Sequence, residues 1–254
     1  MTYPEALRYF DSFVNYETKS EYDYRKSLGL ERIAKLCALL GNPQDSIRSM
    51  HVAGTKGKGS TSAFIYYILR AAGYTVGLYT SPHLVSFRER IRVDGELISE
   101  SDIGRLADTL KDSAQKMAGE ALSFFELYTA LAYLYFKERR VDFAVYEVGL
   151  GGRLDATNII NPLVSVITPI SYEHTDKLGG SLARIAFEKG GIIKKGITCV
   201  SSPQKKEAED EIKNICLERG SKLVMVGRDV IYKELHADER AEHFEVTGRL
   251  GQYK

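Results

Sequence analysis

Residues 51–62, HVAGTKGKGSTS, combine three glycines, two lysines and a row of hydroxyls between an apolar run and a helix-like run. The glycines let main-chain N–H groups turn inward onto an anion, and the N-terminus of a following helix adds positive potential. Lys58 would reach the outer phosphates of a nucleotide, and the hydroxyl of Ser60 would bind Mg²⁺. The match to G-x-x-x-x-G-K-[ST] is imperfect, because Gly54 lies three residues before Gly57 and a glycine separates the lysine from the serine. The segment predicts a phosphate-binding loop, with an ordinary glycine-rich turn as the alternative.

A loop of this kind requires a strand before it and a helix after it, and the sequence offers both. Residues 46–54 have an apolar strand pattern, and residues 60–73 have a helix pattern closed by a glycine. The alternation then continues, with strands predicted at 74–81, 141–149, 163–168, 198–202 and 222–227 and helices at 99–118, 124–140, 181–193 and 204–220.

Strands separated by helices of this length imply βαβ units and a mainly parallel sheet. Asp94 and Gly95 form a favoured tight-turn pair, which predicts a hairpin within residues 90–99. Ser99 lies three residues before Asp102, a spacing that marks a helix start. After Gly227 the pattern becomes polar, and only short strands are predicted there. The predicted fold class is α/β: a P-loop-type, mainly parallel sheet with helices on both faces and a short extra β segment near the C-terminus.

Composition limits the function classes. Hydrophobic residues make up 44% and charged residues 27% of the 254 residues, which is ordinary for a globular protein of one large α/β unit. The formal net charge of +1 gives no indication of a nucleic-acid or acidic-membrane partner. The sequence shows no signal-peptide pattern and no apolar run long enough to cross a bilayer. Three cysteines without metal-like spacing indicate a reducing compartment, so a cytoplasmic protein is expected: Cys37, Cys199 and Cys216.

Glu147 is a candidate for metal or phosphate chemistry outside the loop. It ends the apolar strand DFAVYE, and the carboxyl ends of parallel strands open toward the ligand crevice of such a sheet. A carboxylate there would suit Mg²⁺, which prefers hard oxygen ligands and often keeps several waters. The alternative is a structural role as the first polar residue after a buried strand.

Several ordered segments carry a resemblance to a known family. HVAGTKGKGSTSA resembles the phosphate loop of the folylpolyglutamate synthase and dihydrofolate synthase family, a branch of the Mur-type ligases. YTSPHLVSFRERIRVDGELIS, FFELYTALAYLYF and VYEVGLGGRLDATNII resemble the folate branch, and EHTDKLGGSLARIAFEKGGIIKKG resembles the stretch around its metal histidine and modified lysine. The resemblance runs from about GLERIAKLCALLGNP to GIIKKG and implies a fold like the central domain of Mur ligases. Lys56 departs from the pattern, because the loop usually carries Asn there.

The resemblance implies an ATP-dependent ligase that adds L-glutamate to a folate or dihydropteroate carboxylate through an acyl phosphate. Each step builds charge on phosphoryl oxygens, so positioning and cations should carry most of the catalysis. ATP and Mg²⁺ are therefore implied. The implied ATP-binding residues are Gly54, Thr55, Gly57, Lys58, Gly59, Ser60 and Thr61, and the implied metal ligands are Ser81, Glu147 and His174.

Catalytic roles are implied for Lys58, Glu147, His174 and Lys189. For His174 the alternative is an ordinary solvated loop histidine. Lys189, in FEKGG, matches a family lysine that is often carbamylated, a change that would turn a cation into a metal-binding group. The alternative is an unmodified lysine favoured in the last turn of a helix by the dipole.

The folate end of the substrate needs a flat, mostly apolar slot with a few polar groups. The resemblance implies Phe125 for packing on the pterin ring and Asp155 for hydrogen bonds to its nitrogens. It also implies that Arg88 and Arg153 lie nearby.

Two of these folate assignments have structural alternatives. Phe124 and Phe125 could instead be core residues at a helix start. Arg88, Arg90 and Arg92 alternate in a predicted hairpin strand, so they would share a face and could simply be solvated.

In this family, a segment with nucleotide contacts and a smaller C-terminal α/β domain follow the equivalent of VTGRLGQYK. Residues 1–254 are therefore expected to form the ATP- and folate-binding N-terminal domain, without the domain that completes the glutamate site. Two alternatives are another Mur-type ligase acting on a cell-wall nucleotide precursor, against which the SPHL…ERIRVDGELIS segment argues, and a non-catalytic nucleotide-binding module. The resemblance implies a monomer and leaves the choice between dihydropteroate and tetrahydrofolate open.

Overall fold

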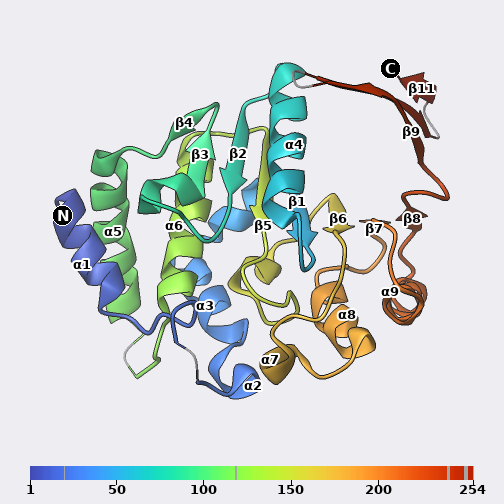
Figure 1. Cartoon of the computed structure of the whole chain (residues 1–254). Coiled ribbons are helices and arrows are strands. Elements are labelled where there is room, and N and C mark those ends of the chain that lie inside the picture. The colour runs from blue at the N-terminus through green and yellow to red at the C-terminus, as the bar shows by residue number, and fades with distance from the viewer. Residues whose placement is uncertain (20, 118, 239–240, 249–250, 254) are drawn as a thin grey trace.

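The computed structural model describes residues 1–19, 21–117, 119–238, 241–248 and 251–253. Its main sheet has eight strands: β1 Ser49–Ala53, β2 Val76–Tyr79, β3 Ile91–Val93, β4 Glu96–Leu97, β5 Phe143–Glu147, β6 Val164–Ile167, β7 Thr198–Ser201 and β8 Leu223–Met225. Their order is β4-β3-β2-β5-β1-β6-β7-β8 (Figure 1). From β2 to β8 the neighbours run parallel, and β3 and β4 add an antiparallel edge. The central position of β1 places the loop that follows it in the middle of the carboxyl edge.

Helices connect the strands and cover both faces of the sheet (Figure 1). The α-helices are α1 Tyr3–Asp11, α2 Tyr24–Ser27, α3 Glu31–Leu39, α4 Lys58–Ala71, α5 Glu100–Gln115, α6 Phe124–Glu138, α7 Thr175–Leu178, α8 Leu182–Gly190 and α9 Lys206–Glu218. The short 3-10 helices are η1 Pro43–Ser46, η2 Phe87–Arg90 and η3 Ala156–Ile159. Among the described residues, no helix has the length and apolar content that crossing a bilayer requires.

Alternation along the strands decides which helix covers which face. Val52 and Val145 pack in one cluster with Tyr66 of α4. Ala144 and Tyr146 point the other way and pack in a cluster with α6. Because side chains alternate across a strand, α4 covers one face, while α6 and, further along, α8 cover the opposite face.

The structure confirms the predicted fold class and the predicted elements between residues 46 and 227. The hairpin turns at Asp94 and Gly95, both with positive φ (52° and 98°), as a tight turn requires. Ser99 caps α5 by accepting a hydrogen bond from the N–H of the third helical residue at 3.0 Å. Ala118, the end of the predicted helix 99–118, lies outside the described residues. The helices α1 to α3 and α7, each nine residues long or shorter, were not predicted.

A second sheet, three-stranded and antiparallel, follows β8 and confirms the predicted short extra strands. Its strands are β9 Ile231–Ala237, β10 Glu242–Gly248 and β11 Gly251–Tyr253, in the order β11-β10-β9. Residues 239–240, 249–250 and 254 of the predicted strand region lie outside the described residues.

Candidate functional site

The predicted phosphate-binding loop connects β1 to α4, and Lys58 is the first residue of the helix. The N–H groups of Thr55 and of the next residue donate to the Pro169 carbonyl at 3.0 and 3.4 Å, which ties the loop to the end of β6. Glycine is required at Gly54 (φ 149°), where a Cβ would lie 1.8 Å from Thr168 Oγ1. The N–H groups in the first turn of α4 have no acceptor within the helix, so they are available to an anion.

Glu147, the last residue of β5, lies against the start of α4. A Cβ on Gly59 would be 3.5 Å from the Glu147 Oε2 atom, and the Ser81 N–H donates to that oxygen at 3.3 Å. The Glu147 side chain is buried, and burial raises its pKa to about 7 against the opposing charge of Lys58. Among the described residues this buried carboxylate has no direct ion pair, and such a group beside a cation-bearing loop suits a hard metal ion.

Lys189 lies in the last turn of α8 and is only 3% exposed. Its ammonium donates to the Gly54 carbonyl at 2.6 Å, so it contacts the phosphate-binding loop directly. Burial, and then the charge of Lys58, lower the pKa of Lys189 to about 8. A lysine of this pKa has an appreciable neutral fraction near pH 7.5, which is the nucleophilic form. Its carbamylation stays a prediction.

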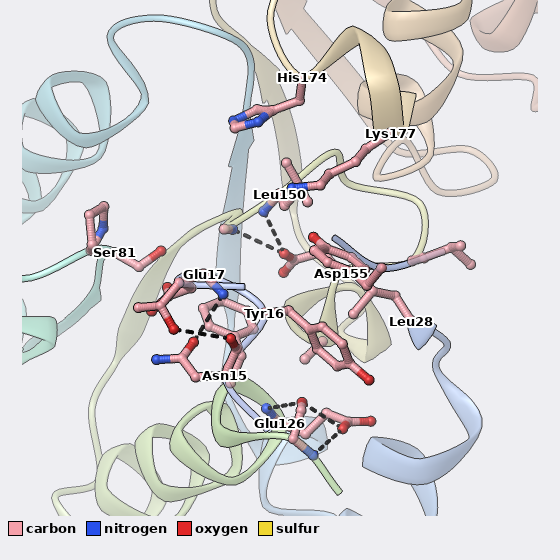
Figure 2. Close-up of a pocket in the computed structure, with 18 of the residues that line it drawn as sticks. Asn15, Tyr16, Glu17, Leu28, Ser81, Glu126, Leu150, Asp155, His174 and Lys177 are labelled. Atoms are coloured by element: carbon pink, nitrogen blue, oxygen red, sulfur yellow. Dashed lines mark hydrogen bonds between the residues drawn. The ribbon is translucent and has the colours of Figure 1, made fainter. Parts of the chain in front are cut away.

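A cavity of about 420 Å³ lies beside this cluster (Figure 2). It is lined by the N-terminal segment 15–18, the start of α6, the loop after β5, and residues on either side of the α7 start. Ser81 lines the cavity and also donates to Glu147, so the cavity and the phosphate-binding loop share one wall. The predicted site residues that the structure brings to this cavity are Ser81, Phe125, Asp155 and His174.

Phe124 and Phe125 have different environments, although both open α6. Phe124 is 1% exposed and stacks on Tyr128 in the core, with ring centroids 5.5 Å apart. Phe125 lines the cavity, where its ring lies 6.1 Å from that of Tyr79. Adjacent helical residues point about 100° apart, so only one of the two faces the core.

Asp155 caps η3, and its carboxylate is buried at the cavity wall. Its Oδ2 atom accepts hydrogen bonds from the N–H groups of Gly149 and Leu150, both at 3.0 Å (Figure 2). Its Oδ1 atom accepts from the N–H and the hydroxyl of Thr157, at 3.0 and 2.5 Å. Burial raises the pKa of Asp155, while these hydrogen bonds favour the ionised form and lower it. The plane of the carboxylate is therefore fixed.

Arg88 and Arg153 are not among the described residues that line the cavity, and their place near the folate stays a prediction. Arg88 donates from Nε to the Ile98 carbonyl at 2.7 Å, and Arg153 makes two hydrogen bonds to Glu188, at 3.0 and 2.9 Å. The strand face that the hairpin arginines were predicted to share does not form, because residues 87–90 fold as the 3-10 helix η2.

Arg90 lines the cavity instead and is 2% exposed, so it is not a solvated arginine. Its two Nη atoms donate to the two carboxylate oxygens of Glu17, at 2.9 and 2.7 Å. Its Nε donates to His83 Nδ1 at 2.9 Å. Such a bidentate pair is both strong and orienting, and it fixes the N-terminal segment beside the cavity.

Residues 13–19 and 21–23, which we name the N-terminal strap, supply one wall of the cavity through residues 15–18 and 22, and no sequence pattern predicts this role. The carbonyl of Val14 accepts the N–H of Phe124 at 3.0 Å, which fixes the start of the strap to α6. Tyr16 and Tyr22 of the strap line the cavity with ring centroids 4.7 Å apart. The strap has no helix or strand period, so only its pair of tyrosines could have suggested a binding wall.

The variant Glu17→Gln is expected to lower the free energy of unfolding by about 1–2 kcal/mol, because the buried Arg90 guanidinium loses its charged partner. Denaturant unfolding of the two proteins measures this difference. Glu21→Gln, an exposed carboxylate on the same strap, is the control and should change stability by less than about 0.5 kcal/mol. Equal losses for the two variants would show that the Arg90 pair does not hold the strap.

His174 lines the cavity and occupies the N-cap of α7 in the left-handed region, with φ 48° (Figure 2). Within the described ranges, no group of three or more His, Cys, Asp or Glu side chains is arranged to hold a metal ion. A metal at the predicted set would therefore rely on Glu147 together with hydroxyl, phosphate or water oxygens. The roles of Ser81 and His174 as metal ligands stay predictions.

Comparison with known proteins identifies the family. The model of the Mur ligase middle domain matches residues 52–248. The chain belongs to this family. The matched region contains every predicted site residue, from Gly54 to Lys189, and it confirms the resemblance seen in the sequence segments.

Matching relatives within the family are named as folylpolyglutamate or dihydrofolate synthases. The folylpolyglutamate synthase of Lacticaseibacillus casei is 38% identical over 257 residues, covering 98% of this chain and 58% of that protein. The dihydrofolate synthase/folylpolyglutamate synthase of Bacillus subtilis is 46% identical over 191 residues, covering 73% of this chain and 44% of that protein. A solved FPGS–AMPPCP–folate complex matches with a TM-score of 0.91 at 36% identity, covering 99% of this chain and 60% of that one. The chain therefore spans between 44% and 60% of the length of these proteins.

Proposed function

We propose that this chain is the ATP- and folate-binding portion of a ligase that joins L-glutamate to the carboxylate of a folate or a dihydropteroate. One observation carries the proposal: Ser81 lines the cavity while its N–H donates to Glu147, which lies against the start of α4. A helix N-terminus suited to phosphate and a cavity suited to a flat ring thus share one wall. The relatives support these substrates, since the matching solved complex is named for AMPPCP and folate.

The phosphate side of the site would be supplied by Lys58 and by the free N–H groups in the first turn of α4. Mg²⁺ fits the donors present there, because the buried Glu147 carboxylate has one backbone hydrogen bond, from Ser81, whose hydroxyl is a further oxygen donor. When bound, the ion would neutralise charge on the phosphate oxygens.

The reaction then has two displacements. A carboxylate oxygen of the folate attacks the terminal phosphorus of ATP, and ADP leaves. The amino nitrogen of glutamate attacks the acyl carbon, phosphate leaves, and the nitrogen loses a proton as the amide forms. Lys58 stabilises the charge that develops on the phosphoryl oxygens. Phe125 and Asp155 hold the ring end of the substrate, which converts an encounter into an oriented attack.

Pteroate, a ligand that carries the ring but no glutamate, tests whether the cavity binds the ring end of the substrate. Calorimetric titration should show pteroate binding to the wild-type chain, and Phe125→Ala should weaken it about five- to tenfold, because an aromatic wall of the cavity is lost. Phe64→Ala, which removes a 71% exposed ring on α4, is the matched control and should leave pteroate affinity unchanged.

Titration of Mg·ATP into the same variants tests the phosphate-binding side of the site independently of the ring-binding side. Phe125→Ala should keep the wild-type affinity for Mg·ATP, since the Phe125 ring packs at the ring side of the cavity, near Gly149 and Tyr79. A wild-type chain that binds Mg·ATP but shows no pteroate binding at millimolar concentration would contradict the folate assignment and leave only a nucleotide-binding function.

A further inference from the structure

His51 is a buried histidine with no place in the reaction described above. It lies on β1, three residues before Gly54, and is 0% exposed. Its Nε2 atom lies 2.8 Å from the Thr157 hydroxyl, across the space between the sheet and η3. In the part of the chain that the structure describes, its Nδ1 atom has no hydrogen-bond partner. A leucine or valine would fill a central strand position without leaving a buried polar atom unpaired.

The direction of each hydrogen bond in this group is fixed by the carboxylate at its end. Three backbone N–H groups and the Thr157 hydroxyl converge on the oxygens of Asp155, so these oxygens act as acceptors. The Thr157 hydroxyl therefore donates to Asp155 Oδ1 at 2.5 Å and accepts from His51 Nε2–H at 2.8 Å. The relay His51→Thr157→Asp155 runs in one direction, from the sheet to the cavity wall.

The burial of His51 keeps its ring neutral. Desolvation, and then the charge of Lys194, lower the pKa of His51 to about 3, so the ring stays a single N–H donor through the physiological range. The donor is Nε2–H, because that atom faces the Thr157 oxygen. A charged His51 would offer a second donor at Nδ1, where no acceptor is found among the described residues.

We propose that His51 is a positioning residue for the ring-binding end of the cavity: it orients the Thr157 hydroxyl, one of the four donors that hold the Asp155 carboxylate in place before the ligand enters. The proposal rests on the proposed function, in which Asp155 meets the nitrogens of the pterin ring. Asp155 lies at the cavity wall in Figure 2. The relay reaches one oxygen of its carboxylate, and the loop N–H groups donate to the other. Because β1 continues directly into the phosphate-binding loop, the same strand positions both halves of the site.

The test measures pteroate and Mg·ATP affinities by calorimetry in a set of matched variants. His51→Leu and Thr157→Val each break the relay and should weaken pteroate binding about five- to twentyfold, with Mg·ATP affinity changed less than about twofold. The double variant should be no weaker than about the larger single effect, because both changes break one chain of hydrogen bonds. His51→Gln, whose side-chain N–H can reach the Thr157 oxygen, should recover pteroate affinity to within about threefold of the wild type.

Ser165→Ala is the matched control for lost burial. Ser165 is the register partner of His51 on β6, is 0% exposed, and donates to the Ile192 carbonyl at 2.9 Å. Its removal deletes a buried hydrogen bond on the same face of the sheet without touching the relay, so pteroate affinity should not change. If His51→Leu fails to fold, Thr157→Val decides, because it keeps the shape of the side chain and removes only the hydroxyl.

The outcomes are separable. Unchanged pteroate affinity in Thr157→Val, additive losses in the double variant, or equal losses of pteroate and Mg·ATP affinity in His51→Leu would each overturn the positioning role. In all three cases the proposed function would stand, provided that Phe125→Ala still weakens pteroate. A wild-type chain that does not bind pteroate would overturn both proposals together.

Discussion

Lys58→Ala should weaken the binding of Mg·ATP at least tenfold and toward a hundredfold, which corresponds to about 1.4–2.7 kcal/mol. The lysine opens α4 at the point where the free N–H groups of the first turn converge, so its ammonium adds a charge-assisted contact to an anion already placed there. Isothermal titration of the two proteins with ATP in excess Mg²⁺ measures the difference. Circular dichroism should show unchanged folding, because alanine keeps the backbone hydrogen bonds of α4 and, among the described residues, the Lys58 side chain makes no hydrogen bond or ion pair.

The same loop contains its own control. Lys56 carries the same charge two residues earlier, and its side chain is exposed. Lys56→Ala should therefore change Mg·ATP affinity by no more than about twofold. If the two alanine variants lose affinity equally, general positive charge attracts the nucleotide and Lys58 is not a specific phosphate ligand. If neither loses affinity, the phosphate-binding loop is wrongly assigned.

The parallel sheet and the loop at its centre are predictable from sequence because both depend on local rules. Buried strands have short apolar runs, and the carboxyl ends of parallel strands must share an edge. These two rules alone place Glu147, at the end of its strand, beside the phosphate-binding loop, where the structure also has it. The hairpin at Asp94 follows from turn chemistry in the same way.

The cavity wall was predicted less well, because it depends on contacts between distant segments. Arg88 and Arg90 look alike in sequence, and only the 3-10 turn of η2 decides that Arg90 faces the cavity. Its partner Glu17 lies 73 residues away, in a strap without periodicity. The relay begins with a contact between His51 and Thr157, 106 residues apart, and a histidine in an apolar strand gives no sign of its partner.

Helix geometry distinguishes the environments of two neighbouring phenylalanines. Phe124 and Phe125 are indistinguishable by type, yet a rotation of about 100° between them sends one ring to the core and the other to the cavity. Such assignments require the position of the helix axis relative to the sheet, which the sequence does not contain.

Glu147→Gln should separate stability from metal-dependent binding. In the metal-free protein the pKa of Glu147 is raised from 4.5 to about 7, so ionising the folded state costs free energy that ionising the unfolded state does not. The wild-type protein therefore has its full stability below the unfolded pKa, where Glu147 is protonated, and loses part of it as the pH rises through 7. At pH 8 glutamine removes the cost, and the variant should be more stable by at most about 3 kcal/mol, or roughly 5–10 °C in Tm.

The gain in stability should shrink as the pH falls and vanish below the unfolded pKa of 4.5, as the wild-type carboxyl becomes protonated in both states. Thermal melts at several pH values without Mg²⁺ or nucleotide measure this trend. Glu188→Gln is the control: that buried glutamate is paired bidentately with Arg153, so its replacement should lower Tm at pH 8. A gain in both variants would mean that removal of any buried charge stabilises this fold.

Binding should move in the opposite direction to stability. Glu147→Gln keeps the shape of the side chain but removes the charge that a hard cation requires, so the Mg²⁺-dependent part of ATP binding should fall at least tenfold. Titrations with and without Mg²⁺ isolate that part, and Glu188→Gln should leave it nearly intact because Glu188 faces Arg153 and Tyr24. A Glu147→Gln protein that melts at a lower temperature and binds Mg·ATP normally would make Glu147 a structural residue. A protein that is more stable and has lost its Mg²⁺ dependence would show that the fold keeps this carboxylate, at a cost to its own stability, for the metal.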